Sequence, residues 1–254
     1  MRIFISADME GATGVVQWAQ VTSADREYEF GCRMQMHDVK AVVNGALEAG
    51  AGEILINDSH DGMTNLDIDE LSFDSRVRLL TGSSKRLSMV EGLEQADAAF
   101  FVCYHAKAGT ENAILDHTMS AGAVHSVVLN GVEVGETGLN AAVLAQKKIP
   151  LALVTGDSAV CEEASLLMGD GLITACVKDA HSRTSADGLL PKDSGRLLKK
   201  AARKAVERIH AGISPCMNIG DGDFDLRITF NDSLRCDRAS KVPGAERIGG
   251  RTVR

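Results

Sequence analysis

Two carboxylates stand at the point where the first apolar run of the chain ends. The run at residues 3–5 is followed by Asp8 and Glu10, and then by Gly11. An apolar run that gives way to acids and glycine is typical of a buried strand opening into a functional loop. Because side chains alternate along a strand, both carboxylates face the same side while the extended geometry lasts. Buried carboxylates are almost always paired, so this pair predicts either a bound cation or, more simply, two solvated acids at a strand end.

Two later apolar runs are followed by a histidine in the same way. His60 comes shortly after the run at residues 53–57, and His105 directly after the run at 98–104. Considered alone, each histidine is more simply interpreted as an ordinary loop or core residue. Because the carboxyl ends of parallel strands meet at one edge of a sheet, we expect both to lie close to Asp8. Carboxylates and imidazoles are ligands of zinc, manganese and iron, so the three strand ends together predict a metal site.

Apolar periodicity predicts strands and helices in alternation along most of the chain. Strands are expected at residues 3–5, 53–57, 77–80, 98–104, 151–155 and 172–177. Helices are expected at residues 25–49, 89–93, 136–147, 162–168 and 194–211. This alternation is typical of an α/β fold with a mostly parallel sheet and helices on both faces.

Two short motifs predict local structure within this pattern. Thr22 and Asp25 resemble a capping box at the start of the first long helix. Asn130 and Gly131 lie between two apolar runs, which favours a β-hairpin with a type I′ turn.

The polar stretch at residues 179–191 is the best position for a domain boundary, because glycine and proline bound it. We expect residues 1–185 to form the α/β domain that carries the metal site and the catalytic residues. Residues 186–254 are expected to form a smaller α+β unit with a strand at 225–230, a short helix from residue 232 and a final strand at 246–253. The chain ends inside that last strand, so we expect the smaller unit to be shortened or incomplete.

Composition and charge exclude several classes of function. The formal net charge of −8 opposes binding to nucleic acid, and 44% hydrophobic with 24% charged residues is ordinary for a globular protein. The sequence shows no secretory leader and no apolar run long enough to span a membrane. Its six cysteines include no close pair, which favours reduced thiols. We therefore expect a cytoplasmic protein with no nucleic-acid or membrane partner.

A serine motif offers an alternative chemistry. The segment GDS that ends in Ser158 resembles a block found in some serine hydrolases, so a Ser158-dependent hydrolase is an alternative prediction. No glycine follows the serine, however, as a nucleophile elbow requires. No GxGxxG pattern follows an expected strand either, which disfavours a nucleotide-binding role.

Five separated segments together resemble one protein family. They are SADMEG, NDSH, CYHA, DHTM and VGETGLNA, and they occur in this order between Met1 and about Leu198. In these segments the chain resembles the DppA-type D-aminopeptidase family of zinc metallopeptidases, whose signature is SxDxEG. The resemblance implies a site for two zinc ions. In it Asp8 would bridge the metals, Glu10 and His60 would complete one, and His105 and Glu136 would complete the other.

Glu136 and His117 enter the expected site through the resemblance alone. From its context, Glu136 would be interpreted as an acid in the first turn of a helix, and Glu133 is an equally acidic neighbour. His117 would be an ordinary loop histidine, whereas the resemblance makes it the catalytic histidine near the metals. There it would move a proton to the leaving amine or hold the oxyanion.

The resemblance implies a dinuclear zinc aminopeptidase acting on short peptides, including those with an N-terminal D-residue. Two metals would activate a water molecule and stabilise the tetrahedral oxyanion, and manganese or cobalt would suit the same ligands. The α-amino group of the substrate would bind a metal, Asp58 or Asp61. The family further implies a link to dipeptide transport and a ring-shaped homo-oligomer, a decamer, with contacts from Trp18 and the C-terminal unit. A non-catalytic peptide-binding protein associated with a transporter is the alternative from another functional class.

Overall fold

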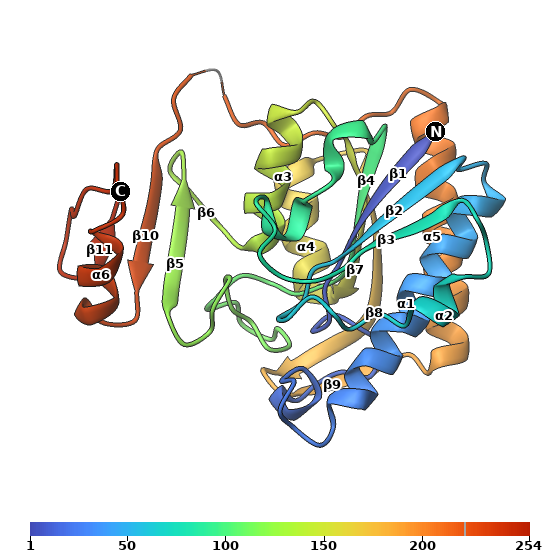
Figure 1. Ribbon diagram of the computed structural model, residues 1–254, viewed down its shortest axis with the longest axis horizontal. Coiled ribbons are helices and arrows are strands. Elements are labelled where there is room, and N and C mark those ends of the chain that lie inside the picture. The colour runs from blue at the N-terminus through green and yellow to red at the C-terminus, as the bar shows by residue number, and fades with distance from the viewer. Residues whose placement is uncertain (221) are drawn as a thin grey trace.

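The computed structural model describes residues 1–220 and 222–254, which form two β-sheets with helices packed around them (Figure 1). The larger sheet has the strand order β3-β2-β1-β4-β7-β8-β9, and its neighbouring strands are parallel except for β8 and β9. Its strands are β1 (Arg2–Ala7), β2 (Glu53–Asp58), β3 (Val77–Leu80), β4 (Ala98–Tyr104), β7 (Leu151–Asp157), β8 (Ile173–Ser182) and β9 (Ser185–Gly188). The expected α/β fold with a mostly parallel sheet is confirmed.

Helices cover both faces of the larger sheet (Figure 1). One face carries α1 (Tyr28–Glu48) and α5 (Pro191–His210), the other carries α3 (Glu136–Gln146) and α4 (Ser158–Met168), and α2 (Ile68–Leu71) is a single turn. Val39, Val42 and Val43, which lie at helical spacing along α1, are fully buried in the first of these layers. Within the described residues, no helix is long and apolar enough to cross a membrane.

The smaller sheet is antiparallel and has the strand order β11-β10-β5-β6. Its strands are β5 (Val124–Leu129), β6 (Val132–Val134), β10 (Leu226–Phe230) and β11 (Thr252–Val253), and α6 (Ser233–Ala239) packs beside β10 and β11. Asn130 and Gly131 have φ angles of 50° and 83°, so the hairpin between β5 and β6 has the two left-handed positions of a type I′ turn.

The expected boundary between residues 185 and 186 falls inside β9. Most of the polar stretch at 179–191, in which that boundary was expected, extends β8 and forms β9, which pairs with it. The helix that follows, α5, packs against α1 in the layers of the larger sheet. The smaller sheet also takes β5 and β6 from before that boundary. The two sheets are therefore interleaved along the chain.

Three local expectations are wrong. The capping box of Thr22 and Asp25 does not form, because the Asp25 amide donates to the Thr22 carbonyl in a turn and α1 begins only at Tyr28. The helix expected at 89–93 is replaced by two short 3₁₀ turns, since Gly92, with a φ of 91°, interrupts it. The strand expected near the C-terminus shortens to β11, because two consecutive glycines turn the chain first.

Candidate metal centre

The carboxyl ends of β1, β2 and β4 meet at one edge of the larger sheet. Ala7, the last residue of β1, pairs with Asp58 in β2 and with Val102 in β4. The residues that follow these strands therefore converge, as parallel strand ends must. The two acids and two histidines predicted from the strand ends all lie at this edge, and each is less than one-tenth exposed.

Asp8, Glu10 and His60 form one group of ligand-type atoms that lie within 4.8 Å of one another. His60 Nδ1 is 3.2 Å from Asp8 Oδ1 and 3.1 Å from Glu10 Oε2. One nitrogen and two carboxylate oxygens around a common point are a donor set that zinc accepts.

His105, His117 and Glu136 form a second group of the same kind, again with ligand-type atoms within 4.8 Å. His105 Nε2 is 3.4 Å from Glu136 Oε1 and 3.5 Å from Asp8 Oδ2. Asp8 therefore joins the two groups, because its Oδ1 faces His60 and its Oδ2 faces His105. The two groups contain the five residues that the family resemblance implies as ligands, together with His117. Glu136 is the first residue of α3, yet its carboxylate faces His105.

Backbone carbonyls fix the orientation of the first two histidines. His60 donates from Nε2 to the Val21 carbonyl at 2.7 Å, and His105 donates from Nδ1 to the Ala106 carbonyl at 3.0 Å. Because a carbonyl only accepts, the other nitrogen of each ring faces the carboxylates and carries a proton only in the charged form. Burial disfavours that form, but the facing carboxylates, Glu10 for His60 and Glu136 for His105, outweigh it and raise the pKa of both histidines well above the usual value. In the neutral form of each ring, the unprotonated nitrogen faces the carboxylates. That tautomer is the one that binds a metal. Val21 and Ala106 contribute main-chain atoms, so their side chains gave no signal in the sequence.

Asp8 and Glu10 are buried close together, so their negative charges repel each other unless a positive charge lies nearby. Burial and the neighbouring Glu10 raise the pKa of Asp8 to about 7. Burial acts on Glu10 as well, but the facing histidines, His60 first, outweigh it and hold the pKa of Glu10 well below its usual range. Asp8 Oδ2, Glu10 Oε2 and His105 Nε2 have no hydrogen-bond partner within the described residues. Such buried, unpaired ligand atoms are costly unless a cation lies among them, so the donor set fits a divalent metal ion.

His117, the third member of the second group, lies on the loop between β4 and β5. Its Nε2 is 3.9 Å from Glu10 Oε1 and 3.6 Å from Glu136 Oε1, and its Nδ1 donates to the Leu115 carbonyl at 2.8 Å. The unprotonated nitrogen therefore points toward the carboxylates. This geometry suits a metal ligand and a proton carrier alike. Removal of a metal ligand would weaken metal binding, whereas removal of a proton carrier would leave metal binding unchanged.

Two aromatic contacts hold the His117 ring. It stacks on His105, with ring centroids 4.0 Å apart and planes inclined by 9°, and the Trp18 ring meets it edge-on at 5.6 Å. Burial, with a smaller effect from His105, lowers the pKa of His117. The ring is therefore fixed in place and favours its neutral form.

Gly11 allows the loop after β1 to lie against β4. Its amide donates to the Cys103 carbonyl at 2.8 Å, and a Cβ atom at this position would lie 2.0 Å from the Tyr104 carbonyl oxygen. Only glycine leaves room for that approach. The strand-to-loop turn predicted from the sequence thus has a steric requirement.

Lys178, on β8, forms hydrogen bonds to the backbone of the same loop. Its buried ammonium group donates to the carbonyls of Glu10, Ala12 and Val15 at 2.7, 2.7 and 2.5 Å. Burial lowers the pKa of Lys178 to about 8. Sequence reasoning missed this residue, whose only signal is a single lysine within an apolar strand.

A cleft of about 410 Å³, which we call the metal cleft, opens over the carboxylates and is lined in part by Trp18 and Asp61. Of the two acids expected to bind a substrate amine, Asp58 is already committed, because it accepts from the backbone amides of Asn65 and Leu66 at 2.5 and 2.9 Å. Asp61 makes no hydrogen bond or ion pair with any described residue. It is the acid of the pair that faces the cleft with its charge available.

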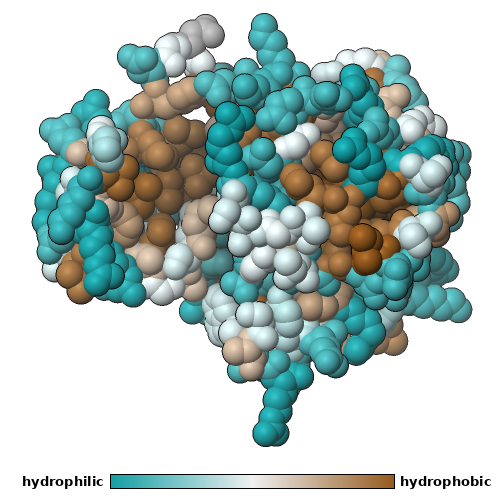
Figure 2. Space-filling view, viewed as in Figure 1, coloured by the Kyte–Doolittle hydropathy of each residue, from teal (hydrophilic) through white to brown (hydrophobic). Residues whose placement is uncertain are grey.

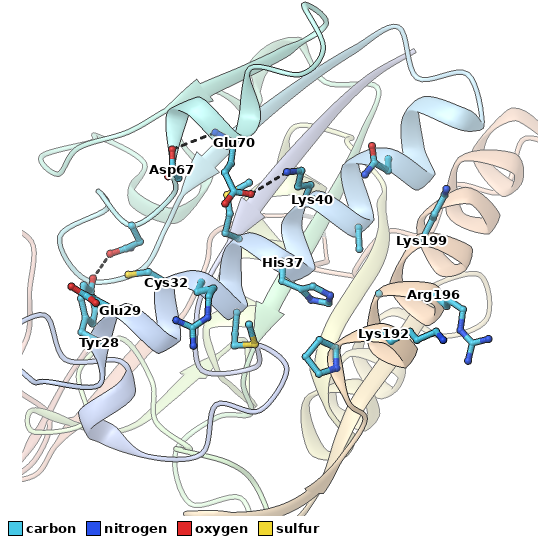
Figure 3. Close-up of a pocket in the computed structure, with 18 residues that line it drawn as sticks. Tyr28, Glu29, Cys32, His37, Lys40, Asp67, Glu70, Lys192, Arg196 and Lys199 are labelled. Carbon is cyan, nitrogen blue, oxygen red and sulfur yellow. Dashed lines mark hydrogen bonds and ion pairs between the residues drawn. The ribbon is translucent and has the colours of Figure 1, made fainter.

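A larger groove of about 800 Å³ runs between α1 and α5 on another part of the surface (Figure 3). The Lys40 ammonium and the Glu70 carboxylate pair at 3.0 Å on its rim, and Lys192, Arg196 and Lys199 lie along α5. None of its lining residues also lines the metal cleft. Within the described residues, the groups of atoms able to hold a metal are only the two described above.

The serine of the GDS segment begins a helix. Asp157 caps α4 by accepting from the Val160 amide at 2.9 Å, and Ser158 is the first residue of that helix. The pocket that Ser158 lines contains no histidine among the described residues. The segment therefore has a structural explanation as a helix cap.

Comparisons with known proteins agree with one another. A family model described as D-aminopeptidase matches residues 1–254. The D-aminopeptidase of Bacillus subtilis (strain 168) is 36% identical over 257 residues, which cover 100% of this chain and 90% of that protein. Among solved structures, the Zn-dependent D-aminopeptidase DppA from Bacillus subtilis, described as a self-compartmentalizing protease, is similar with a TM-score of 0.92 and 33% identity, over 100% of this chain and 90% of that one.

Proposed function

Because the chain belongs to the D-aminopeptidase family and is therefore a metallo-aminopeptidase, we propose that it removes the N-terminal residue from short peptides at a dinuclear zinc site. The observation that carries this proposal is the position of Asp8, a buried carboxylate whose two oxygens face His60 and His105. The similar proteins are named for D-residues, so we extend the proposal to peptides that begin with a D-amino acid.

The proposed ligands divide into two sets around one shared carboxylate. Asp8 is shared, Glu10 and His60 complete the first set, and His105 and Glu136 complete the second. The first compact group matches the first set, and the second compact group contains His105 and Glu136 together with His117. The distance of 3.5 Å between Asp8 Oδ2 and His105 Nε2 and the buried atoms without partners support the sharing of Asp8. Manganese or cobalt would suit the same oxygen and imidazole donors, so the choice of zinc rests on the similar Zn-dependent protein.

Zinc bound by these residues would supply Lewis-acid chemistry, lowering the pKa of a water molecule and polarising the scissile carbonyl. Proton movement falls to His117, whose unprotonated Nε2 lies over the carboxylates. It accepts the proton that the attacking water releases and returns it to the nitrogen of the leaving group. The stacking on His105 and the edge contact with Trp18 hold the ring at that position throughout.

Asp61 is the group that we assign to the α-amino end of the peptide. Asp58 is occupied by the backbone amides of its own loop, whereas Asp61 lines the metal cleft directly after His60. An ammonium group beside Asp61 would place the first peptide bond over the metal ligands. This arrangement limits cleavage to the N-terminal residue.

The direct test is hydrolysis of D-alanyl and L-alanyl dipeptides by the purified protein, with the released N-terminal amino acid measured by chromatography. We expect release that a zinc chelator abolishes and added zinc restores. Binding of these peptides without cleavage would instead favour the transporter-associated binding protein.

We further propose that the protein works in the cytoplasm as a ring-shaped homo-oligomer, a decamer. Support comes from the similar structure, which is described as a self-compartmentalizing protease.

A further inference from the structure

A second cavity adjoins the metal cleft on the far side of His117. It has a volume of about 450 Å³, and it shares His117 and Ala121 with the metal cleft as lining residues. Its lining includes Arg183, and we call it the Arg183 cavity. Because His117 is the proposed proton carrier to the leaving nitrogen, we infer that the leaving part of the peptide would lie on this side.

The two cavities differ in charge. The described residues that line the metal cleft include four acids, Asp8, Glu10, Asp61 and Glu136, and no lysine or arginine. The lining of the Arg183 cavity includes Arg183 and two acids, Asp116 and Glu133. Both acids are paired with a cation, Asp116 with Arg183 and Glu133 with Lys107, so this cavity is less acidic than the metal cleft. A short peptide is a zwitterion, so its ammonium end favours the acidic cleft and its carboxylate end favours the arginine.

The Arg183 guanidinium is held in one orientation. It lies over the Trp18 ring, 5.3 Å from the centroid. Its Nε pairs with Asp116 Oδ1 at 2.8 Å, and its Nη2 donates to the Asp116 carbonyl at 2.7 Å. The remaining amino group, Nη1, makes no hydrogen bond with a described residue, and the side chain is 51% exposed. Because the guanidinium is already fixed in this way, binding a ligand costs little further side-chain conformational entropy.

The distances fit a peptide of two or three residues. The Trp18 ring is 5.6 Å from the His117 ring and 5.3 Å from the Arg183 guanidinium, so the separation between His117 and Arg183 is at most the sum of these two distances. An extended chain advances roughly 3.3–3.6 Å per residue, so one or two residues beyond the cleaved bond span roughly 3–7 Å. A hydrogen bond of about 3 Å at each end covers the rest of that separation.

We propose that Arg183 binds the C-terminal carboxylate of the peptide substrate and so selects free dipeptides and tripeptides. This inference rests on the proposed function and names the substrate class for the same site. Guanidinium and carboxylate form a charge-assisted pair that a C-terminal amide cannot replace. A longer peptide carries its carboxylate past Arg183 and loses the contact.

The test compares two substrates that differ only in that end group, D-alanyl-D-alanine and its C-terminal amide. For the unaltered protein we expect kcat/KM to be roughly 10- to 100-fold higher for the free acid. In Arg183→Gln this preference should fall to within about 3-fold of unity, mainly through a higher KM for the free acid, and Arg183→Lys should retain an intermediate preference.

A matched control is Lys107→Gln. The Lys107 ammonium pairs with Glu133, which lines the Arg183 cavity, so it is a second cation close to the same wall. We expect the preference for the free acid to survive this change. Loss of the preference in Lys107→Gln instead of Arg183→Gln would overturn the assignment.

Two further outcomes separate this inference from the function on which it rests. Equal loss of activity on both substrates in Arg183→Gln would mean that Arg183 merely supports the His117 loop through Asp116, and the inference would be wrong. Equal hydrolysis of acid and amide by the unaltered protein would contradict it too, while leaving the aminopeptidase function intact. Absence of hydrolysis of either substrate would overturn both.

Discussion

At the scale of single residues, the acids of the site have unequal tasks. Asp8 faces both histidines through different oxygens, whereas Glu10 faces His60 on one side and His117 on the other. Glu136 is further fixed by the Met119 amide, which donates to its Oε1 at 2.7 Å. Loss of Asp8 therefore removes a contact from both proposed metals, and loss of Glu136 from one.

His117→Gln separates the two roles that its position allows. If His117 carries a proton, we expect kcat to fall roughly 10²- to 10⁴-fold while zinc content stays unchanged. Parallel assays of peptide hydrolysis and of zinc by elemental analysis check this. A variant that loses zinc along with activity would show that His117 is a ligand.

Lys178→Met probes a residue that touches no metal ligand side chain. Its ammonium holds three carbonyls of the loop that carries Glu10. Methionine keeps much of the volume but offers no donor, so we expect a folded protein whose zinc affinity is roughly 10- to 100-fold weaker. Competition with a chelator of known affinity measures this.

The matched control for Lys178→Met is Lys192→Met, at an exposed position on α5. It should leave zinc affinity unaltered. Equal affinities for all three proteins would contradict the positioning role of Lys178.

Much of this site could be predicted from the sequence, because residues that follow neighbouring parallel strands lie together at one edge of the sheet. Asp8, His60 and His105 each follow an apolar run, and the parallel sheet brings such positions together. Glu136 begins a helix and needed the family resemblance. Lys178 could not be predicted, because its partners are carbonyl groups more than 160 positions away in the chain.

At the scale of elements, the packing of the β1 loop against β4 sets the position of the first ligands. Gly11→Ala tests this contact, since the added Cβ would lie 2.0 Å from the Tyr104 carbonyl oxygen. We expect a loss of about 3 kcal/mol in the free energy of unfolding, measured by denaturant titration. Gly250→Ala is the control, because no atom lies within 4 Å of its added Cβ. Two variants with equal stability would show that the loop relaxes freely.

The sequence predicts an element well where burial alone determines it. The run at 98–104 matches β4 to the residue, since every side chain in it is buried. Predictions of secondary structure failed where backbone hydrogen bonding forms an element that the pattern of apolar and polar residues does not indicate. Residues 179–191 look polar enough for a loop, yet β9 lies at the sheet edge, where polar side chains are exposed to solvent.

At the scale of the whole molecule, the smaller sheet helps to position a residue of the site and also contributes exposed apolar surface. Its strand β6 leads through Gly135 directly into α3, whose first residue is Glu136. The hairpin therefore sets where a proposed ligand enters the cleft. Figure 2 shows apolar surface gathered in the hollow between this sheet and the body of the protein, and Val132, Phe224 and Leu226 are among the exposed apolar residues.

Self-association is the prediction that belongs to this scale. We expect sedimentation velocity at micromolar concentration to show a homogeneous species of many chains, ten if the ring is a decamer, instead of a 27.0 kDa monomer. Apolar surface on one chain favours such association. A fully active monomer would contradict the proposed assembly and leave the metal site untouched.

The number of zinc ions per chain tests the central claim most directly. Elemental analysis after removal of loosely bound metal should give about two zinc ions for the unaltered protein and for Asp170→Asn, which changes an exposed acid. Asp8→Asn should retain much less than one, because both proposed metals lose a shared ligand. One zinc ion in the unaltered protein, or two in Asp8→Asn, would contradict the dinuclear site.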